Sequence, residues 1–203
     1  MSRPIYVVLD TETTGLDVNT AGIISFSYII TDLENEYERG TIEMNPFESE
    51  SDIENASEAL KINGYTPEKI ATFDSARVGM ARIADVFQRA TLLGDGLWPR
   101  VMGYNIVAYD MPIIKNNAKK YGITLPDIRH DYLDVLQGIR MLDVMGVIPV
   151  KFKEDGKPMG NRLYEAVQRL EIESEQDKFH GSMYDTEMTL RIFQTLAEKL
   201  NNN

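Results

Sequence analysis

An apolar run at residues 5–9 continues directly into Asp10 and Glu12. Five consecutive apolar or aromatic residues predict a strand buried in a sheet. Residues two apart in a strand point to the same face, so Asp10 and Glu12 share one face while Thr11 points to the other. Two half-buried carboxylates repel each other unless a proton or a cation neutralises them. This strand end is therefore a candidate Mg²⁺ or Mn²⁺ site, the alternative being a turn cap at Asp10 and a solvated Glu12.

The rest of the chain predicts an α/β fold with a mixed sheet and helices on its faces. Two long stretches at 22–32 and 37–45 complete a three-stranded antiparallel meander. After them, strands alternate with helices, which indicates parallel strands with crossover helices. The other predicted strands are 100–105 and 128–133. One predicted helix begins after Thr66, and a longer one ends before a turn at 94–96. The remaining predicted helices lie within 111–122, 134–142, 160–170 and 182–200.

Local signals predict how several helices begin, end and pack. Thr66 is expected to cap a helix whose first residue is Pro67, and Gly122 is expected to close the helix at 111–122. Apolar residues at helical spacing in the last helix form one stripe, as in a helix packed on a core. The members of this stripe are Thr186, Leu190, Phe193, Ala197 and Leu200.

Length and composition favour a single globular domain that spans 1–203. A chain of 203 residues can bury a full core, and the absence of cysteine excludes disulfides and thiolate metal sites. The start of the sequence has no signal-peptide pattern, and the run at 5–9 is too short to cross a bilayer, so we expect a cytoplasmic protein with no membrane partner. The Gly- and Pro-rich stretch at 146–160 is expected to be a mobile loop or a small hairpin within this domain.

The charge balance limits how the chain can bind nucleic acid. A formal net charge of −11 argues against loose binding to phosphates, which depends on Lys and Arg. It does not exclude a nucleic acid substrate, because a carboxylate metal site adds negative charge that bound cations offset. Two basic groups either follow a phosphate backbone or form a solvated face. These groups are Lys115, Lys119 and Lys120, and Lys151, Lys153, Lys157 and Arg162.

Three later residues are acidic or imidazole groups at the ends of predicted elements. Asp110 lies at a junction between a strand and a helix, where its alternative role is a helix cap. His180 precedes Asp185 by five positions, and Asp185 lies in the first turn of the last helix. Ser182 and Asp185 also fit a variant of the capping box. Taken with the two carboxylates of the first strand, however, their order favours one shared site.

In these motifs the chain resembles the DnaQ-like, or DEDDh, 3′-to-5′ exonucleases, which have a ribonuclease H-like fold. The stretch VVLDTETTGL at 7–16 closely matches the first motif of that family. The four residues between His180 and Asp185 match the spacing of the family's histidine branch. The resemblance extends from residue 5 to about residue 198.

The second motif departs from the family pattern. Asn105 is followed by three residues and then by Tyr109 and Asp110, where the histidine branch commonly has two residues and then Phe and Asp. In this respect GYNIVAYDMPII is more similar to the proofreading domain of family B polymerases. Those domains have a tyrosine four residues before the last aspartate, where this chain has Gly181. Tyr184 has the wrong spacing, so the histidine assignment is kept.

The resemblance implies metal-dependent release of nucleoside monophosphates from single-stranded 3′ ends. Asp10, Glu12, Asp110 and Asp185 would hold two divalent cations, Mg²⁺ or Mn²⁺. His180 would be the general base that takes a proton from water, and an unperturbed imidazole pKa near ~6.5 suits this task. Glu12 would also orient the water.

The resemblance also implies three substrate-binding residues. Thr13 and Leu16 would lie against the 3′-terminal nucleotide, and Asn105 would contact the penultimate one. The alternative for Leu16 is ordinary core packing, and the alternative for Asn105 is a loop cap.

The resemblance leaves the substrate and partner open. DNA is favoured because it is the usual substrate in the family. The first alternative is an RNA-directed enzyme resembling oligoribonuclease or ribonuclease T, since aromatic residues stack bases of either sugar type. The second is a proofreading subunit that docks on a DNA polymerase, and a homodimer is also compatible with the sequence. The aromatic candidates are Trp98, Tyr104, Tyr109 and Tyr121.

Overall fold

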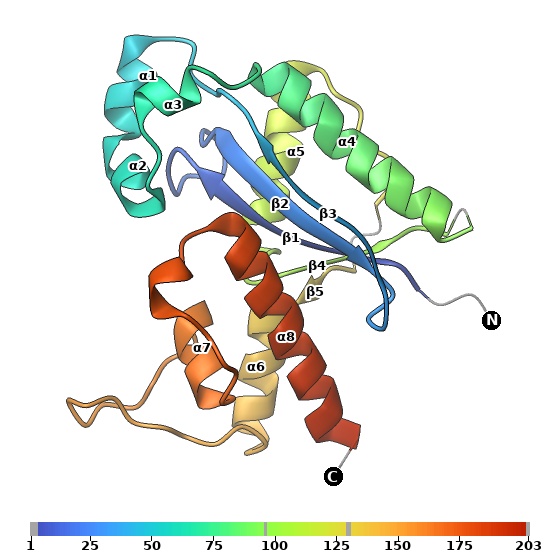
Figure 1. The fold of residues 1–203 in the computed structure, drawn as a ribbon, viewed down its shortest axis with the longest axis vertical. Coiled ribbons are helices and arrows are strands. Elements are labelled where there is room, and N and C mark those ends of the chain that lie inside the picture. Colours follow the sequence, from blue (N-terminus) through green and yellow to red (C-terminus); the bar gives the residue numbers. More distant parts are fainter. Residues whose placement is uncertain (1–3, 96, 129–130, 202–203) are drawn as a thin grey trace.

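The structure, a computed structural model, describes residues 4–95, 97–128 and 131–201. Its centre is a five-stranded sheet with the strand order β3-β2-β1-β4-β5 (Figure 1). β1, β2 and β3 are antiparallel neighbours, whereas β4 pairs parallel with both β1 and β5. The predicted mixed sheet is therefore confirmed. The strands are β1 (Tyr6–Thr13), β2 (Ile23–Thr31), β3 (Glu36–Glu43), β4 (Arg100–Gly103) and β5 (Leu133–Asp134).

Helices cover both faces of this sheet. The helices α4 and α5 pack on one face, and α6, α7 and α8 pack on the other (Figure 1). The short helices α1, α2 and α3 lie together as a lobe near the end of β1. The helices are α1 (Glu50–Asn55), α2 (Ser57–Asn63), α3 (Pro67–Ile70), α4 (Ala76–Leu93), α5 (Asp110–Tyr121), α6 (Val135–Val144), α7 (Leu163–Arg169) and α8 (Ser182–Asn201), with a 3₁₀ turn η1 (Gln176–Lys178). No helix in the described ranges is long and apolar enough to cross a membrane.

The alternation of side chains in β1 assigns its residues to the two faces. Val7 packs in the core under α4 and α5, whereas Val8 packs in the core under α6, α7 and α8. Continuing this period of two places Asp10 and Glu12 on the α8 face and Thr11 on the α5 face. The two carboxylates therefore lie on the face that α8 covers.

β1 is longer than the predicted strand at 5–9. It continues to Thr13 and pairs with β2 over its whole length, with a register shift between Glu12 and Thr13. The carboxylates therefore lie within a hydrogen-bonded strand and not in the turn that follows it. The turn-cap alternative for Asp10 is wrong.

Several predicted element ends are confirmed. The hydroxyl of Thr66 accepts a hydrogen bond from the backbone N–H of Lys69, and Pro67 is the first residue of α3. Gly122 closes α5 in the left-handed region, with a φ of 66°. The stretch at 146–160 contains a small hairpin, in which Phe152 bridges to Pro158.

One predicted strand is much shorter than expected, and two helices were not predicted. The predicted strand at 128–133 is reduced to Leu133 and Asp134, and residues 129–130 lie outside the described residues. The helices α1 and α2 were not predicted, because Leu60 is the one buried residue that they contribute and an apolar period is missing.

The predicted stripe on α8 is rotated relative to the side that faces the core. Thr186 is buried as expected, but Leu200 is 51% exposed. The side chains that enter the core below Thr186 are those of Met188, Ile192 and Leu196. The predicted stripe differs because Phe193, Ala197 and Leu200 line a cavity between α8 and α6.

Candidate active site

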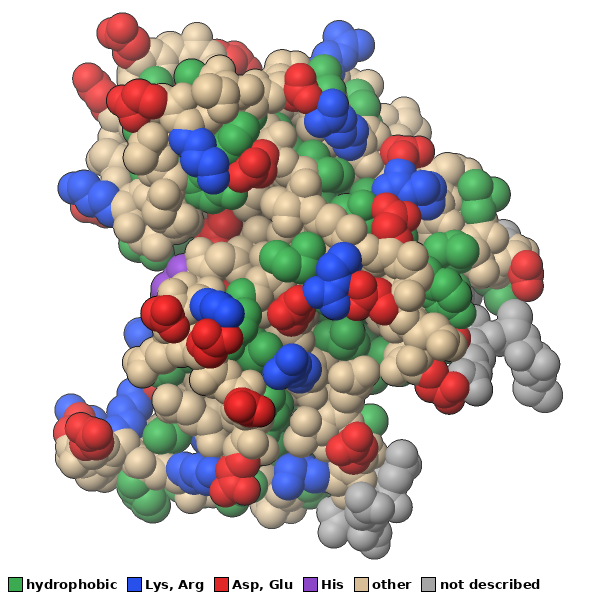
Figure 2. All heavy atoms as spheres, viewed as in Figure 1, with side chains coloured by type: hydrophobic (Ala, Val, Ile, Leu, Met, Phe, Trp, Pro, Cys, Tyr) green, Lys and Arg blue, Asp and Glu red, His purple; other side chains and the backbone are tan. Residues whose placement is uncertain are grey.

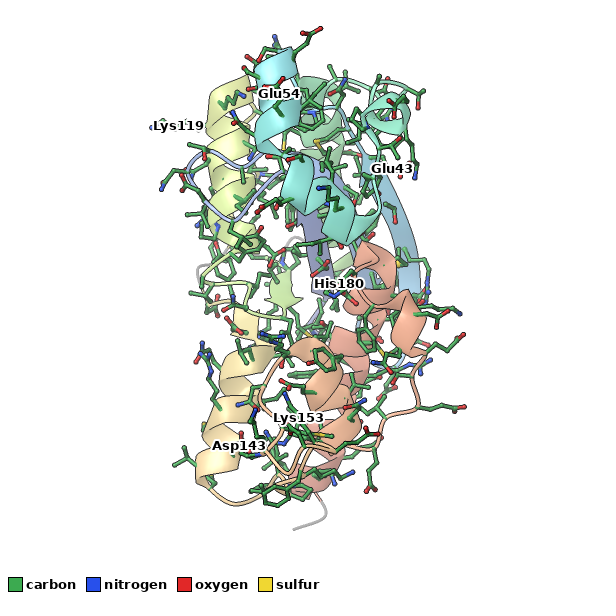
Figure 3. All side chains as sticks on the ribbon, turned by 90° about the vertical axis from the view of Figure 1, so that its left-hand side faces the viewer. Glu43, Glu54, Lys119, Asp143, Lys153 and His180 are labelled. Atoms are coloured by element: carbon green, nitrogen blue, oxygen red, sulfur yellow. The ribbon has the colours of Figure 1, made fainter. Side chains whose placement is uncertain are left out.

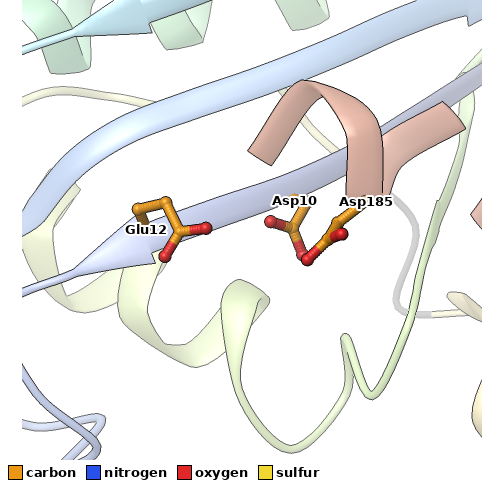
Figure 4. A group of neighbouring side chains, drawn as sticks. All are labelled: Asp10, Glu12 and Asp185. Atoms are coloured by element: carbon orange, nitrogen blue, oxygen red, sulfur yellow. The ribbon is translucent and has the colours of Figure 1, made fainter. Parts of the chain in front are cut away.

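Three carboxylates from distant parts of the chain meet on the α8 face of β1. Single oxygens of Asp10, Glu12 and Asp185 all lie within 4.8 Å of one another (Figure 4). Asp10 and Glu12 come from β1, and Asp185 comes from the first turn of α8. The structure therefore brings together three of the four carboxylates that were predicted to hold cations.

Buried serine hydroxyls hold the start of α8 against the sheet. Ser27 and Ser25 of β2 lie directly opposite the two β1 carboxylates in the strand register. Their hydroxyl oxygens lie 2.7 and 3.1 Å from the hydroxyl of Ser182. Small side chains allow the first turn of α8 to approach β2 closely, and this approach brings Asp185 over β1. Sequence reasoning gave Ser182 only a capping role and missed the two β2 serines, although small polar residues in an apolar strand were a visible signal.

Asp110 reaches the same strand from the other side. It is the first residue of α5, with Tyr109 in the cap position, so the helix-cap alternative for Asp110 is wrong. One oxygen of its buried carboxylate accepts hydrogen bonds from the backbone N–H of Thr11 at 3.1 Å and from the Thr11 hydroxyl at 2.7 Å. Its charge also raises the pKa of Asp10. Asp110 thus lies beside the other carboxylates, although its bonds are to the opposite face of β1.

Burial disfavours the charged forms of all four carboxylates, and repulsion within the cluster adds to this for Asp10 and Glu12. Burial, followed by the charges of Asp110, Asp185 and Glu12, raises the pKa of Asp10 well above its usual range. Burial and then the neighbouring charges raise the pKa of Glu12 to about 8. Burial raises the pKa of Asp185 to about 7 against a hydrogen bond from the backbone of His180, and raises that of Asp110 to about 6 against local hydrogen bonds.

The donor atoms of this cluster fit a divalent cation. The Oδ1 atom of Asp185 is buried and has no hydrogen-bond partner among the described residues. An unpartnered buried carboxylate oxygen is unfavourable unless a proton or a cation meets it. Because every donor in the cluster is a carboxylate oxygen, the residues suit hard cations such as Mg²⁺ or Mn²⁺.

His180 lies at the start of α8 but outside this carboxylate group. Figure 3 shows it between the first turn of α8 and the lobe of α1, α2 and α3. The residue is exposed, and its φ of 69° is in the left-handed region, which is uncommon for a residue with a Cβ atom. The preceding ring of Phe179 packs edge-to-face against Tyr184 at 5.2 Å and Tyr164 at 6.4 Å between ring centroids.

The predicted substrate residues Thr13 and Leu16 line a cavity of about 440 Å³ that also reaches Glu12. Leu16 is 86% exposed, so the core-packing alternative is wrong. The opposite wall is α2, from which Ile62 contributes a side chain that is 67% exposed. Figure 2 shows the surface hollowed between this lobe and the rest of the molecule. Ile62 was missed because α2 itself was not predicted.

Asn105 has a structural role in the turn before α5. Its φ is 62°, its N–H donates to Asp134 Oδ1 at 3.1 Å, and its carbonyl accepts from the N–H of Tyr109 at 3.1 Å. It is not among the residues that line the cavity beside Leu16. The loop-cap alternative is therefore consistent with the structure.

Several residues of the two basic groups have acidic partners on the surface. Figure 2 shows positive and negative side chains interspersed over the visible face. This arrangement favours a solvated face over a continuous phosphate track. The pairs are Lys120–Glu48, Lys151–Glu171, Lys153–Glu165 and Lys157–Asp155, with N–O distances of 2.5 to 3.2 Å.

Comparisons with known proteins agree with the predicted exonuclease family. The family model RNase_T, described as Exonuclease, matches residues 7–193. A search of curated proteins found no match. Among solved structures, E. coli exonuclease I in complex with a dT13 oligonucleotide has 21% identity and a TM-score of 0.78, and the match covers 98% of this chain and 42% of that chain.

Two further structures give the same result. A product-bound exonuclease I has 20% identity and a TM-score of 0.77, with 98% of this chain and 45% of that chain covered. A complex described as ExoI/SSB-Ct has 20% identity and a TM-score of 0.76, with 98% and 42% covered. The chain thus spans less than half the length of these relatives. At this identity the likeness shows the fold, and it confirms the predicted ribonuclease H-like class.

Proposed function

The chain belongs to the RNase_T exonuclease family, and from this premise we propose that it is a metal-dependent 3′-to-5′ exonuclease acting on single-stranded ends, with DNA favoured over RNA. One observation carries the proposal. Asp10, Glu12 and Asp185 converge within 4.8 Å, and Glu12 also borders the open cavity that exposes Leu16. A cation site and an apolar contact for a base are thus adjacent.

Asp10, Glu12, Asp110 and Asp185 would hold two divalent cations, Mg²⁺ or Mn²⁺. When bound, such cations lower the pKa of a water molecule and stabilise the negative charge that develops around phosphorus. The unpartnered oxygen of Asp185 and the raised pKa values of the cluster support this assignment. The same features are unfavourable for the cluster without a cation.

The hydrolytic step follows from the groups around the cluster. Glu12 orients a water molecule, and the imidazole of His180 takes one of its protons as the oxygen attacks the terminal phosphorus. The bond between phosphorus and the 3′ oxygen of the preceding nucleotide breaks. That oxygen takes up a proton and becomes the new 3′ hydroxyl, while the released product is a nucleoside 5′-monophosphate.

The cavity beside Glu12 is suited to the terminal nucleotide. Leu16 and Ile62 offer exposed apolar side chains from opposite walls, and a base inserted between them would cover both. Thr13, which follows Glu12 in the sequence, lines the same cavity. Contact of Asn105 with the penultimate nucleotide remains part of the proposal, in addition to its role in the turn.

The proposal is tested with matched 5′-labelled single-stranded DNA and RNA in Mg²⁺, Mn²⁺ or EDTA. We expect a ladder that shortens from the 3′ end only when a cation is present, and faster with DNA. Asp10→Asn should abolish the ladder, while Asp127→Asn, at an exposed aspartate with no assigned role, should not. Faster cleavage of RNA would support the oligoribonuclease-like alternative. Absence of cleavage with both substrates, or a ladder that survives Asp10→Asn, would contradict the proposal.

A further inference from the structure

The hydroxyl of Tyr109 joins two parts of the candidate site that are far apart in the sequence. Tyr109 immediately precedes Asp110 at the start of α5. Its Oη atom lies 2.6 Å from Thr13 Oγ1 and donates to the carbonyl of Gly15 at 2.8 Å. The Thr13 hydroxyl donates to the same carbonyl at 2.9 Å. These three groups form a closed triangle just after the last carboxylate of β1.

The hydrogen bonds in this triangle are limited by the number of hydroxyl protons. Each hydroxyl has one proton, and the Gly15 carbonyl has two lone pairs that can accept both. Removing the Tyr109 hydroxyl leaves this carbonyl with the Thr13 hydroxyl alone. The phenol oxygen therefore attaches the Gly15 end of the turn to the start of α5.

The turn at residues 14–22, which Tyr109 attaches in this way, carries the exposed Leu16. Its far end is held separately, because Thr14 and Gly22 exchange two hydrogen bonds of 2.8 and 2.9 Å and Asn116 donates to the carbonyl of Val18. The bonds to Gly15 are the attachment nearest to Leu16.

Thr13 connects both walls of the cavity. Its carbonyl accepts a hydrogen bond from Asn63 Nδ2 of α2 at 3.3 Å, while its hydroxyl contacts Tyr109. Ile62, adjacent to Asn63, faces the cavity opposite Leu16. Bonds that meet at Thr13 thus connect the two segments that carry Leu16 and Ile62.

We propose that the Tyr109 hydroxyl is a positioning group that fixes Gly15 and Leu16 relative to α2, and so sets the gap that receives the terminal nucleotide. This inference rests on the proposed function for the identity of the ligand. The hydroxyl acts through Leu16 and not on the reacting atoms, so it affects substrate affinity and leaves the chemical step unchanged.

Tyr109→Phe removes only the oxygen and keeps the partly buried ring that packs against the core. We expect KM for single-stranded DNA to rise about fivefold to tenfold, the effect of losing one hydrogen bond, while kcat stays within about twofold. Thr13→Val should raise KM as well, and the double variant should show less than the product of the two effects. Tyr28→Phe is the matched control. It also removes a tyrosine hydroxyl, which donates to Glu38 at 2.5 Å, but this residue does not line the cavity.

Amide hydrogen exchange gives a second result that does not depend on activity. The amides of Gly15 and Leu16 should exchange faster in Tyr109→Phe than in the unchanged protein, and not in Tyr28→Phe. Unchanged exchange overturns the proposal, as does a loss of kcat at constant KM, or faster exchange with an unchanged KM. If the unchanged protein has no nuclease activity, the proposed function fails, and unchanged oligonucleotide binding by Tyr109→Phe in Ca²⁺ would overturn the positioning role separately.

Discussion

The carboxylates of β1 and the histidine before α8 are held in very different ways. Asp10 and Glu12 lie within an eight-residue strand that pairs with β2 along its whole length. His180 is exposed and has left-handed backbone, its backbone donates a hydrogen bond to Asp185, and the preceding ring of Phe179 packs against Tyr184. The difference indicates that the carboxylates are preorganised before a cation binds, whereas we expect the position of the imidazole to depend on the packing of Phe179.

The largest effect is expected from Asp10→Asn, which alters the preorganised part. Activity should fall by about 10³-fold or more, because a carboxylate that would hold a cation is lost. The metal-free protein should nevertheless melt a few degrees higher at neutral pH, since one source of repulsion in the buried cluster is removed. Activity assays and thermal melts in EDTA measure both effects. A large drop in melting temperature would show that Asp10 stabilises the fold instead.

His180→Ala alters the other part and should be the next largest change. We expect kcat to fall by about 10²-fold to 10³-fold, as for the loss of a general base. Added Mg²⁺ should still raise the melting temperature of this variant, because His180 lies outside the group formed by Asp10, Glu12 and Asp185. Kinetics measure the contribution of His180 to the chemical step, and thermal melts with and without Mg²⁺ measure cation binding. Loss of the Mg²⁺ response in this variant would mean that the two regions are not independent.

Strand alternation and the order of motifs were enough to predict the main carboxylate group. Asp10 and Glu12 share a face because the period of a strand is two, and this rule needs no tertiary information. The attachment of Asp110 to Thr11 could not be predicted in this way, because it depends on where α5 packs against the sheet. The same holds for the docking of Ser182 on β2.

The lobe of α1 and α2 was missed for a different physical reason. These helices are short and polar, and their ends are defined by local caps, such as the box formed by Ser49 and Asp52, more than by an apolar stripe. Without them, Ile62 could not be placed opposite Leu16. The carboxylate cluster was therefore more predictable than the cavity, since the cavity forms between segments that lack a periodic signal.

Phe179→Leu tests whether packing positions the imidazole. Leucine keeps an apolar side chain but loses the edge-to-face contacts with Tyr164 and Tyr184, so we expect kcat to fall about tenfold with little change in KM. In a His180→Ala background the same substitution should change kcat by less than about twofold, because no imidazole remains to be positioned. Equal losses in both backgrounds would indicate a general effect on folding.

The smallest expected effect is a pH-dependent change in melting temperature to which Glu12 and Asp185 contribute. The folded pKa values of Glu12 and Asp185 are about 8 and about 7, against about 4 for unfolded acidic groups. Between these values the folded state binds more protons than the unfolded state. The free energy of unfolding of the metal-free protein should therefore fall as the pH rises from about 4 to about 8.

Added Mg²⁺ should reverse this trend where the carboxylates are charged. Cations bind the deprotonated groups, so the rise in melting temperature on adding Mg²⁺ should be a few degrees near pH 8 and close to zero near pH 5. Glu12→Gln should flatten the pH dependence in EDTA, and His180→Ala should leave it unchanged. A Mg²⁺ response that is equal at both pH values would contradict a preorganised carboxylate cluster, since binding would then not compete with protons at these residues.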